Sequence, residues 1–464
     1  MSSSDYATDG ALGTSSMGLN PFTTPGLIRA IATGTDISAN VVGNIIASAE
    51  DSQPNTVSSY NKILVDDAGN YYTYNGAGLT LQATATTNAA FYTSTKVDAV
   101  SYVGKIYVST ANGDIDVFTT ASLSLANAWW TSAPQSKTSM SSYVPHPMIV
   151  YQGNLYVADR NHLHTIDQSA NIALNVLSLG VTGSADGNEN IYALAIDPGT
   201  GLMMISVQTT INISDTLSSR FYVYLYDGIS SKPTRKIEVD DLVTAFYHLE
   251  GQVYIGAGQT LGLWNGNGVT FLRKLQNVSL INTDLPYKQH FASTRSILHV
   301  VDGATVLSYG AAISGKKGFF YTATNPSGGG HLSALVSLGS NKLGIAYATN
   351  KISSFDFSST AAGTATLYFN NIYFPRPIYV RRMRLITTGI TTTAGIGGTA
   401  IIDEFGTVNQ SAVSTFVVLA ADTPEMVFDF DFSSLKLQAI QPKITFDTQG
   451  FGLVRVYIYY DISE

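Results

Sequence analysis

Hydrophobic and polar positions alternate in short runs along most of residues 60–360, and each run ends at glycine, asparagine or aspartate. The stretch AVSYVGKIYVST (99–110) holds an apolar run, a turn at Gly104 and a second apolar run built around Tyr-Val. The same pattern returns in MIVYQGNLYVAD (148–159), with its turn at Gly153. Alternation with β-branched and aromatic residues predicts strands, and glycine supplies the positive φ that tight turns need. The pattern therefore predicts repeated β-hairpins.

The hairpin recurs at a nearly constant interval. The predicted turn positions, which differ by 35, 49, 48, 50, 44 and 46 residues, are Gly69, Gly104, Gly153, Gly201, Gly251, Arg295 and Asn341. A further strand follows most turns, as in DIDVFTTAS, FYVYLYDG and LGLWNGNG. Units of about 40–50 residues with about four strands are typical of β-propeller blades.

We therefore expect an all-β fold with a propeller of about seven blades. The short first interval and the weak last two copies leave six or eight blades open. The segment PNTVSSYNKILV (54–65) is predicted to supply a strand that closes the ring against the last blade.

The two ends of the chain lack the repeat. Residues 1–58 are small, polar and irregular, and we expect an extended N-terminal arm. Residues 59–364 form the predicted propeller. Residues 365–464 contain six to eight predicted strands separated by Gly, Pro, Asp and Ser turns, which is typical of a small C-terminal β-sandwich.

Charge and composition narrow the function classes. Only 12% of the 464 residues are charged, the net charge is −8, and there is no cysteine. An acidic, charge-poor chain lacks the basic surface that dominates nucleic-acid affinity, so we expect no specific nucleic-acid binding. The absence of cysteine excludes disulfides, thiolate metal sites and a cysteine nucleophile.

Export and membrane signals are missing from this sequence. The N-terminal MSSSDYATDGALGTSSMG has neither the basic segment nor the apolar core of a secretory signal. No run approaches the roughly 20 apolar residues of a spanning helix. We therefore expect no membrane insertion and no signal-directed secretion.

Metal-site patterns occur but are incomplete. His162 and His164 stand two apart on a predicted strand, so both face one side, but no third ligand lies nearby in the sequence. DDAGN (66–70), NGDID (112–116) and DGNEN (186–190) cluster oxygen ligands near glycine, as calcium loops do. None has EF-hand spacing, and hairpin turns require the same residues. We interpret these patterns as structural and predict no metal or cofactor site, although calcium at the turns stays open.

Enzyme signatures are also weak. A propeller glycosidase needs paired carboxylates at the channel, and a sialidase needs a cluster of arginines as well. The sialidase Asp-box is present only as a fragment in SADGNEN, without its Trp, and neither a G-x-S-x-G elbow nor a P-loop occurs. We therefore predict no catalytic residues and no enzymatic activity.

Two surface features could bind a ligand or a partner. Arg381, Arg382 and Arg384 form a basic patch on the first predicted sandwich strand. Trp129 and Trp130 stand together in the predicted loop ANAWWTSAP, where they could stack on a sugar or bury against a subunit. Core packing under the loop and a solvated or subunit-facing strand are the more ordinary interpretations.

The organisation of the whole chain resembles that of tailed-bacteriophage virion proteins. An arm near GLNPFTTPG, a degenerate propeller and a C-terminal all-β unit opening with FPRPIYVRRMRL are similar to the propeller-bearing tail-tube, nozzle and hub-associated components. The resemblance implies a non-enzymatic structural protein of the phage tail, made in the host cytoplasm and located in the virion. A glycan-binding, or less plausibly glycan-cleaving, receptor-recognition tail protein is the alternative, and a secreted bacterial propeller lectin is a third.

The expected partners follow from that resemblance. They are copies of this chain, other virion proteins and a host surface glycan. An arm of about 50 residues costs about 1–2 kcal/mol per residue to order, so its few apolar residues must be buried somewhere. We expect the arm to cross to another copy or another virion protein, and its removal to leave a folded monomeric propeller. The residues available as apolar contacts are Leu19, Phe22, Leu27, Ile28 and Ile31.

Overall fold

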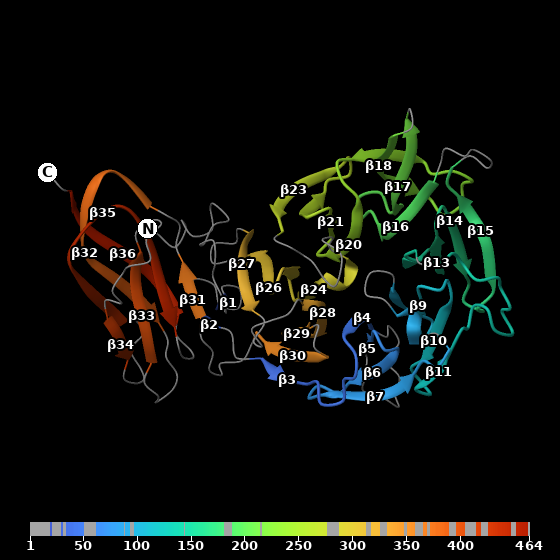
Figure 1. Cartoon of the computed structure of the whole chain (residues 1–464), viewed down its shortest axis with the longest axis horizontal. Coiled ribbons are helices and arrows are strands. Elements are labelled where there is room, and N and C mark those ends of the chain that lie inside the picture. The colour runs from blue at the N-terminus through green and yellow to red at the C-terminus, as the bar shows by residue number, and fades with distance from the viewer. Residues whose placement is uncertain are drawn as a thin grey trace.

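Seven four-stranded antiparallel sheets form a closed β-propeller in the computed structural model (Figure 1). The all-β prediction and the leading blade count are confirmed. The structure describes residues 19–20, 29–30, 34–50, 62–87, 89–92, 97–142, 144–180, 188–213, 216–275, 287–311, 317–324, 332–347, 350–357, 365–368, 372–388, 396–403, 414–418, 426–446 and 452–462.

The first three blades follow one another along the chain, each running from the channel outward. Blade 1 contains β4 (Ile45–Glu50), β5 (Lys62–Asp66), β6 (Asn70–Tyr74) and β7 (Leu79–Thr84). Blade 2 contains β8 (Ala99–Tyr102), β9 (Lys105–Ser109), β10 (Ile115–Thr119) and β11 (Ser124–Ala126). Blade 3 contains β12 (Met148–Tyr151), β13 (Asn154–Asp159), β14 (His162–Ile166) and β15 (Ile172–Ser178).

The other four blades complete the ring. Blade 4 contains β16 (Asn188–Ile196), β17 (Met203–Ile213), β18 (Thr216–Tyr226) and β19 (Arg235–Val239). Blade 5 contains β20 (Val243–Leu249), β21 (Gln252–Ala257), β22 (Thr260–Trp264) and β23 (Val269–Lys274). Blade 6 contains β24 (Phe291–Thr294), β25 (Ile297–Asp302), β26 (Thr305–Ala311) and β27 (Lys317–Thr324). Blade 7 contains β28 (Leu332–Gly339), β29 (Lys342–Tyr347), β30 (Lys351–Asp356) and β3 (Thr35–Asp36).

The hydrophobic core lies between neighbouring blades. One cluster joins blades 1 and 2 through residues such as Ile63 and Phe118, and another joins blades 7 and 1 through Val336 and Ile45. Each sheet is therefore apolar on both faces, which explains why the central strands β5, β9 and β13 are almost wholly buried. A lone blade could not cover two apolar faces, and the ring provides the cover.

The repeat predicted from the sequence corresponds to one blade. Gly104, Gly153, Gly201 and Gly251 all join the first strand of a blade to the second, with φ between 68° and 80°. Their equivalence is therefore confirmed. Gly69 instead joins the second and third strands of blade 1, so its assignment to the same position is wrong. The shift by one hairpin explains the short first interval of 35 residues.

Ring closure differs from the prediction. Within the segment 54–65, the described residues 62–65 belong to β5, the second strand of blade 1. The strand that closes the ring is β3, where Thr35 lies opposite Ser354 and Asp36 opposite Ser353 of β30. Because β3 and β4 are propeller strands, the predicted boundary at residue 58 is also wrong. A two-residue strand carries no periodicity, which is why the sequence pattern did not reveal it.

The N-terminal arm is therefore shorter than predicted. β3 and β4 belong to the ring, so deleting residues 1–50 would remove two propeller strands together with the arm. In the remainder, β1 (Leu19–Asn20) pairs with β2 (Arg29–Ala30), and β1 contacts β27 and β31 (Ala365–Tyr368) of the same chain. Of the five apolar residues proposed to bind a neighbour, Leu19 lies in β1, and Phe22, Leu27, Ile28 and Ile31 lie outside the described residues.

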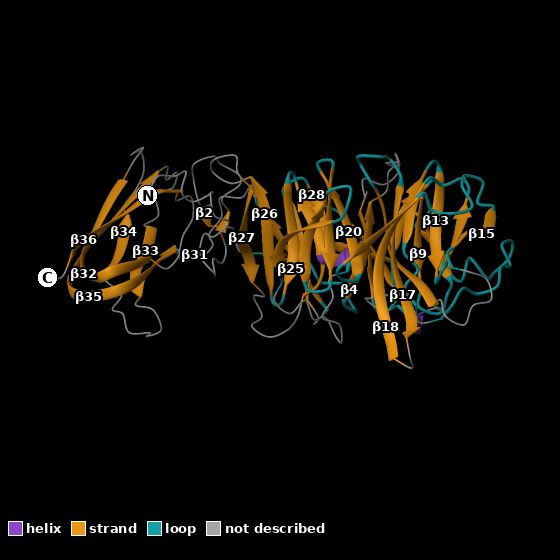
Figure 2. Ribbon diagram, turned by 90° about the horizontal axis from the view of Figure 1, so that it is seen from above, coloured by secondary structure: helices purple, strands orange, loops and turns teal. Residues whose placement is uncertain are grey.

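The C-terminal strands form an all-β unit beside blade 6 (Figure 1). Besides β31 they are β32 (Ile372–Thr388), β33 (Ile396–Asp403), β34 (Ser414–Val418), β35 (Met426–Phe446) and β36 (Gly452–Ile462). The long β35 pairs with β32 through its first part and with β31 and β33 through its last part. The described strands β31–β36 therefore form one six-stranded sheet joined through β35, where the sequence predicted a sandwich (Figure 2).

Candidate functional site

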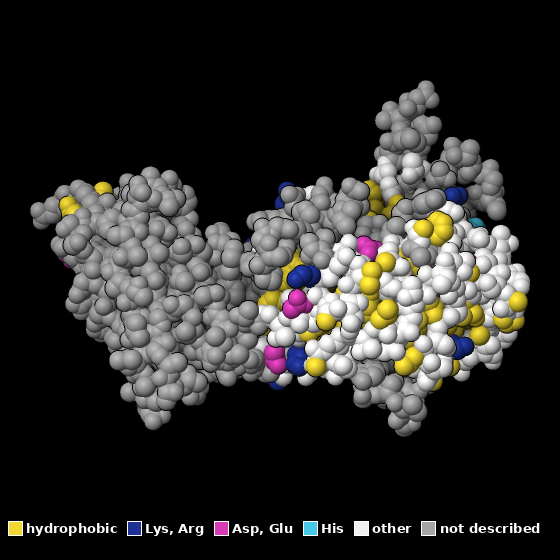
Figure 3. Space-filling view, turned by 60° about the horizontal axis from the view of Figure 1, so that its bottom comes forward, with side chains coloured by type: hydrophobic (Ala, Val, Ile, Leu, Met, Phe, Trp, Pro, Cys, Tyr) yellow, Lys and Arg dark blue, Asp and Glu magenta, His cyan; other side chains and the backbone are white. Residues whose placement is uncertain are grey.

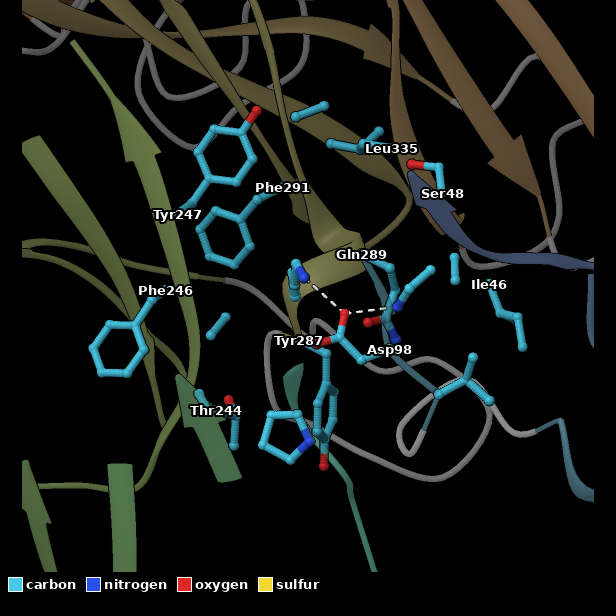
Figure 4. Close-up of a pocket in the computed structure, with 18 of the residues that line it drawn as sticks. Ile46, Ser48, Asp98, Thr244, Phe246, Tyr247, Tyr287, Gln289, Phe291 and Leu335 are labelled. Atoms are coloured by element: carbon cyan, nitrogen blue, oxygen red, sulfur yellow. Dashed lines mark hydrogen bonds and ion pairs between the residues drawn. The ribbon is translucent and has the colours of Figure 1, made fainter. Parts of the chain in front are cut away.

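A cavity of about 290 Å³ lies in the central channel of the ring (Figure 4). All seven blades contribute to its wall through their first strands or the residues just before them. The short 3-10 helix η2 (Lys288–His290) also lines the cavity and contacts β4, β20 and β28. Two chemical features stand out in the wall: paired charges and aromatic side chains.

Asp98 connects three parts of the channel wall. Its Oδ1 accepts hydrogen bonds from Lys288 Nζ at 2.7 Å and from the Ala99 backbone N–H at 2.8 Å. Its Oδ2 accepts a hydrogen bond from the Met148 backbone N–H at 2.9 Å. The carboxylate therefore holds the start of β8, the start of β12 and η2 together, with three donors offsetting its partial burial.

The second carboxylate of the channel wall is paired in the same way. Glu50 Oε2 accepts a hydrogen bond from Lys62 Nζ at 2.7 Å, across the neighbouring strands β4 and β5. A glycosidase needs one carboxylic acid that can give up a proton and one free carboxylate. In the described channel wall, both acidic residues instead have a lysine as an ion-pair partner.

Aromatic and hydroxyl groups make up much of the remaining wall. Tyr247 stacks on Phe291 with ring centroids 6.0 Å apart, and its hydroxyl donates to Ser293 Oγ at 2.9 Å (Figure 4). Burial and the neighbouring Tyr192 raise the pKa of Tyr287 to about 12, so this phenol stays protonated at neutral pH. The wall can contact a small polar ligand, but these phenols cannot act as bases there.

The histidine pair of the sequence lies on β14 and is held by its own blade. His162 Nδ1 lies 2.9 Å from Ser178 Oγ, and His164 Nδ1 accepts a hydrogen bond from the Asn175 backbone N–H at 3.0 Å. Burial lowers the pKa of His164 to about 4, and its ring lies against Trp130. The described residues contain no group of three His, Cys, Asp or Glu side chains arranged for a metal.

The aspartates of the predicted turns stabilise the backbone. Asp66 is fully buried and accepts hydrogen bonds from the Gly43, Ala68 and Asn70 backbone N–H groups, from Asn70 Nδ2 and from the Tyr72 hydroxyl. Asp114 similarly accepts the backbone N–H groups of Ile115, at the start of β10, and of Trp130, and Asp116 accepts that of Ala128, both in the loop after β11. In the third cluster, the side chains of residues 186–188 lie outside the described part of the structure. The turn interpretation thus fits the first two clusters.

The tryptophans and arginines occupy different settings. Trp130 is fully buried and donates from Nε1 to the Thr138 carbonyl at 2.9 Å, and Trp129 packs edge-on against Tyr107. Both indoles contribute to the core between blades 2 and 3. The strand register of the C-terminal unit places Arg382 opposite Asp431 and Arg384 opposite Asp429 of β35, and Arg381 at the register shift beside them.

Sequence patterns did not reveal the channel residues Asp98 and Lys288. They are 190 positions apart, and neither belongs to the hairpin repeat. Lys288 lies in an irregular segment before β24, where no periodic signal exists. The position of Asp98, directly before an inner strand, becomes informative only once the ring is known.

Comparisons with known proteins find only distant structural similarity. No family model and no curated protein matches the chain. Among solved structures, YCF48 bound to D1 peptide is similar over 72% of this chain and all of its own, at 9% identity and a TM-score of 0.47. The extracellular domain of a one-component system from B. thetaiotaomicron is similar over 72% of this chain and 41% of its own, at 11% identity and a TM-score of 0.46. Raptor from Chaetomium thermophilum is similar over 71% of this chain and 29% of its own, at 12% identity and a TM-score of 0.43.

Within the described residues, the structure contains no helix with the length and hydropathy of a membrane span.

Proposed function

We propose that this chain is a non-enzymatic structural component of a tailed-phage particle, in which copies of the propeller assemble in the tail. The observation that carries the proposal is the chemistry of the channel. Its two described carboxylates are each held by a lysine at 2.7 Å, and Asp98 also accepts two backbone N–H groups. Asp98 joins blades 2 and 3 to η2, and Glu50 joins two strands within blade 1, as expected of a rigid scaffold; the two carboxylates offer no acid and base pair for hydrolysis.

The surface of the propeller also supports an assembly role. On the described part of the propeller face shown in Figure 3, charged side chains are sparse and apolar side chains are spread between them. Ile229 is 84% exposed and Phe271 on β23 is 63% exposed. A surface with few charges lets copies approach with little electrostatic repulsion, and exposed apolar side chains favour contact.

The experiment locates the chain directly. Particles released from a culture that carries this coding sequence are purified on a density gradient, and the chain is detected by peptide mass spectrometry and by immunogold labelling. The proposal expects several copies per particle with label on the tail. Recovery of the chain only from the soluble fraction would overturn it. Hydrolysis of a polysaccharide by the purified chain, abolished by Asp98→Asn, would overturn the non-enzymatic part.

A further inference from the structure

A second cavity, of about 300 Å³, opens on the outer part of the ring between blades 3 and 4. The end of β15, the start of β16, β18 and the loop into β19 form its wall. Its volume is at the lower end of the range for small-molecule sites. The lining residues that bear charge or a phenol are Glu189, Tyr224, Lys232, Arg235 and Lys236.

Glu189 is a buried acceptor with one oxygen left over. The residue is only 9% exposed, and its Oε1 accepts hydrogen bonds from the Tyr224 hydroxyl at 2.9 Å and from Thr209 Oγ1 at 3.3 Å. Among the described residues, none donates to Oε2. Glu189 lines the cavity, so a ligand hydroxyl that donates to Oε2 there adds a hydrogen bond to a charged acceptor and gains affinity.

Cationic side chains also line the cavity. Lys236 Nζ lies 3.7 Å from the centroid of the Tyr222 ring and 5.3 Å from that of Tyr224, whose hydroxyl reaches Glu189. Lys232 is exposed beside it. In the described part of the chain, neither lysine has a carboxylate within ion-pair distance. The cavity thus presents an acceptor at its floor and ammonium groups at its rim.

We propose that this cavity binds an acidic sugar, with a ring hydroxyl donating to Glu189 Oε2 and the sugar carboxylate accepting from Lys236 and Lys232. A phosphate or another simple anion would meet the Glu189 carboxylate, and a simple cation would meet the lysines. A neutral sugar would donate to Glu189 but would have no carboxylate to accept from the two lysines. The site gives the ring a recognition function that is independent of where the protein resides, because it depends only on these side chains.

Binding of small glycosides to the full chain tests the site. The probes are the methyl glycosides of glucuronic acid, galacturonic acid and N-acetylneuraminic acid, followed by saturation-transfer NMR and by titration up to about 10 mM, since isolated sugar contacts are often weak. Methyl glucoside and methyl galactoside are the neutral control sugars. The free amino acid alanine is the control for binding of any small zwitterion. We expect at least one acidic glycoside to bind, and to bind at least tenfold more tightly than its neutral match.

Substitutions then assign the binding to this cavity. Lys236→Met should weaken binding about tenfold, the loss expected for one hydrogen bond to a charged group, and Glu189→Gln should also weaken it. The matched control is Lys274→Met on the outer strand β23 of blade 5, which should bind like the unaltered chain. Lys236 is exposed, so its variant should keep the melting temperature of the unaltered chain.

Several results would overturn the proposal. They are no binding by any acidic glycoside, equal binding of the neutral match, displacement of the sugar by alanine, or unchanged affinity of a folded Lys236→Met chain. Failure to find the protein in phage particles would leave these measurements unaffected, so the two proposals fail separately.

Discussion

Blades 2–6 and the seam between blades 7 and 1 solve the same packing problem in different ways. Each of blades 2–6 takes four consecutive strands from one stretch of chain, so its outer strand follows directly from its third. Blade 7 takes three strands from residues 332–356 and its outer strand, β3, from residues 35–36. The ladder between β3 and β30 has only two residue pairs. The ring therefore closes through its shortest strand.

The seam compensates for that short ladder with side chains on both sides of it. Ile37, directly after β3, is 5% exposed in the core between blades 7 and 1, and its N–H donates to the Ile352 carbonyl at 3.0 Å. Asn350 Nδ2 donates to the Val42 carbonyl, and Asp66 binds the Gly43 N–H at 2.8 Å. A blade of this ring therefore depends more on having its apolar face covered than on having a long outer strand. In this ring the seam is covered by residues 37–46.

The largest expected effect comes from removing the seam. A chain that begins at residue 51 lacks β3, β4 and the buried Ile45 and Ile46, each 1% exposed. Burial of each isoleucine contributes about 1.5–3 kcal/mol, and total stability is about 5–15 kcal/mol, so this chain should not fold cooperatively. A chain that begins at residue 34 keeps the seam and should melt cooperatively. Thermal unfolding followed by circular dichroism distinguishes the two, and a cooperative transition in the shorter chain would contradict the seam.

The next effect separates a buried seam aspartate from an exposed turn aspartate. Asp66→Ala leaves the donors of five hydrogen bonds without their acceptor, and we expect a loss of about 3–5 kcal/mol. Asp227→Ala, in the exposed turn after β18 of blade 4, removes only local turn bonds and should cost about 1 kcal/mol or less. Urea unfolding measures both. Equal losses would show that Asp66 has no special role at the seam.

A third effect lies in blade 6, away from the seam, and depends on pH. Burial lowers the pKa of His299 from 6.5 to about 3. Between those values the unfolded chain binds a proton that the folded chain does not, so stability falls as pH falls, by about 1.4 kcal/mol per pH unit. His299→Gln removes this proton, so the loss of stability between pH 6.5 and pH 5 should shrink by about 2 kcal/mol relative to the unaltered chain. An unchanged slope in urea titrations at the two pH values would contradict this assignment.

The smallest effect concerns a surface ion pair at the seam. Lys351 Nζ lies 3.6 Å from Asp36 Oδ2, and both side chains are more than half exposed. Hydrogen bonds from Ser38 are the main cause of the lowered pKa of Asp36. Solvent screening leaves such a pair worth about 0–1 kcal/mol, so Lys351→Met should change stability by less than 1 kcal/mol. A larger loss in urea unfolding would mean that the charge pair, rather than Ile37, closes the ring.

Local signals made most of the ring predictable. The turn glycines Gly104, Gly153 and Gly251 stand where a tight hairpin requires positive φ, so their spacing directly reported the blade repeat. The connection between β4 and β5 contains no glycine. The glycine pattern therefore identifies the second hairpin of blade 1, at Gly69, instead of the first. Closure by residues 35–36 depends on a contact with residues more than 300 positions away, which no local pattern encodes.

The candidate sites were less predictable than the fold, for a related reason. Asp98 meets Lys288, and Glu189 meets Lys236 across one cavity, only because the ring brings separate strands together. Glu189 did fall within the acidic cluster DGNEN, but as a turn residue in a calcium-like pattern and not as a buried carboxylate. The residue types can be read from the sequence, but which of them lie next to one another depends on the fold.

One measurement tests directly whether the ring closes within a single chain. Asp36 and Ser353 lie directly opposite each other, a spacing that suits a disulfide, and the chain has no other cysteine. The double variant Asp36→Cys with Ser353→Cys is oxidised, and the product is examined by non-reducing electrophoresis, with Asp36→Cys and Lys274→Cys as the mispaired control. Closure by β3 predicts a nearly complete intramolecular disulfide in the monomer and a higher melting temperature. A disulfide that links two chains, or no disulfide beyond the control, would contradict it.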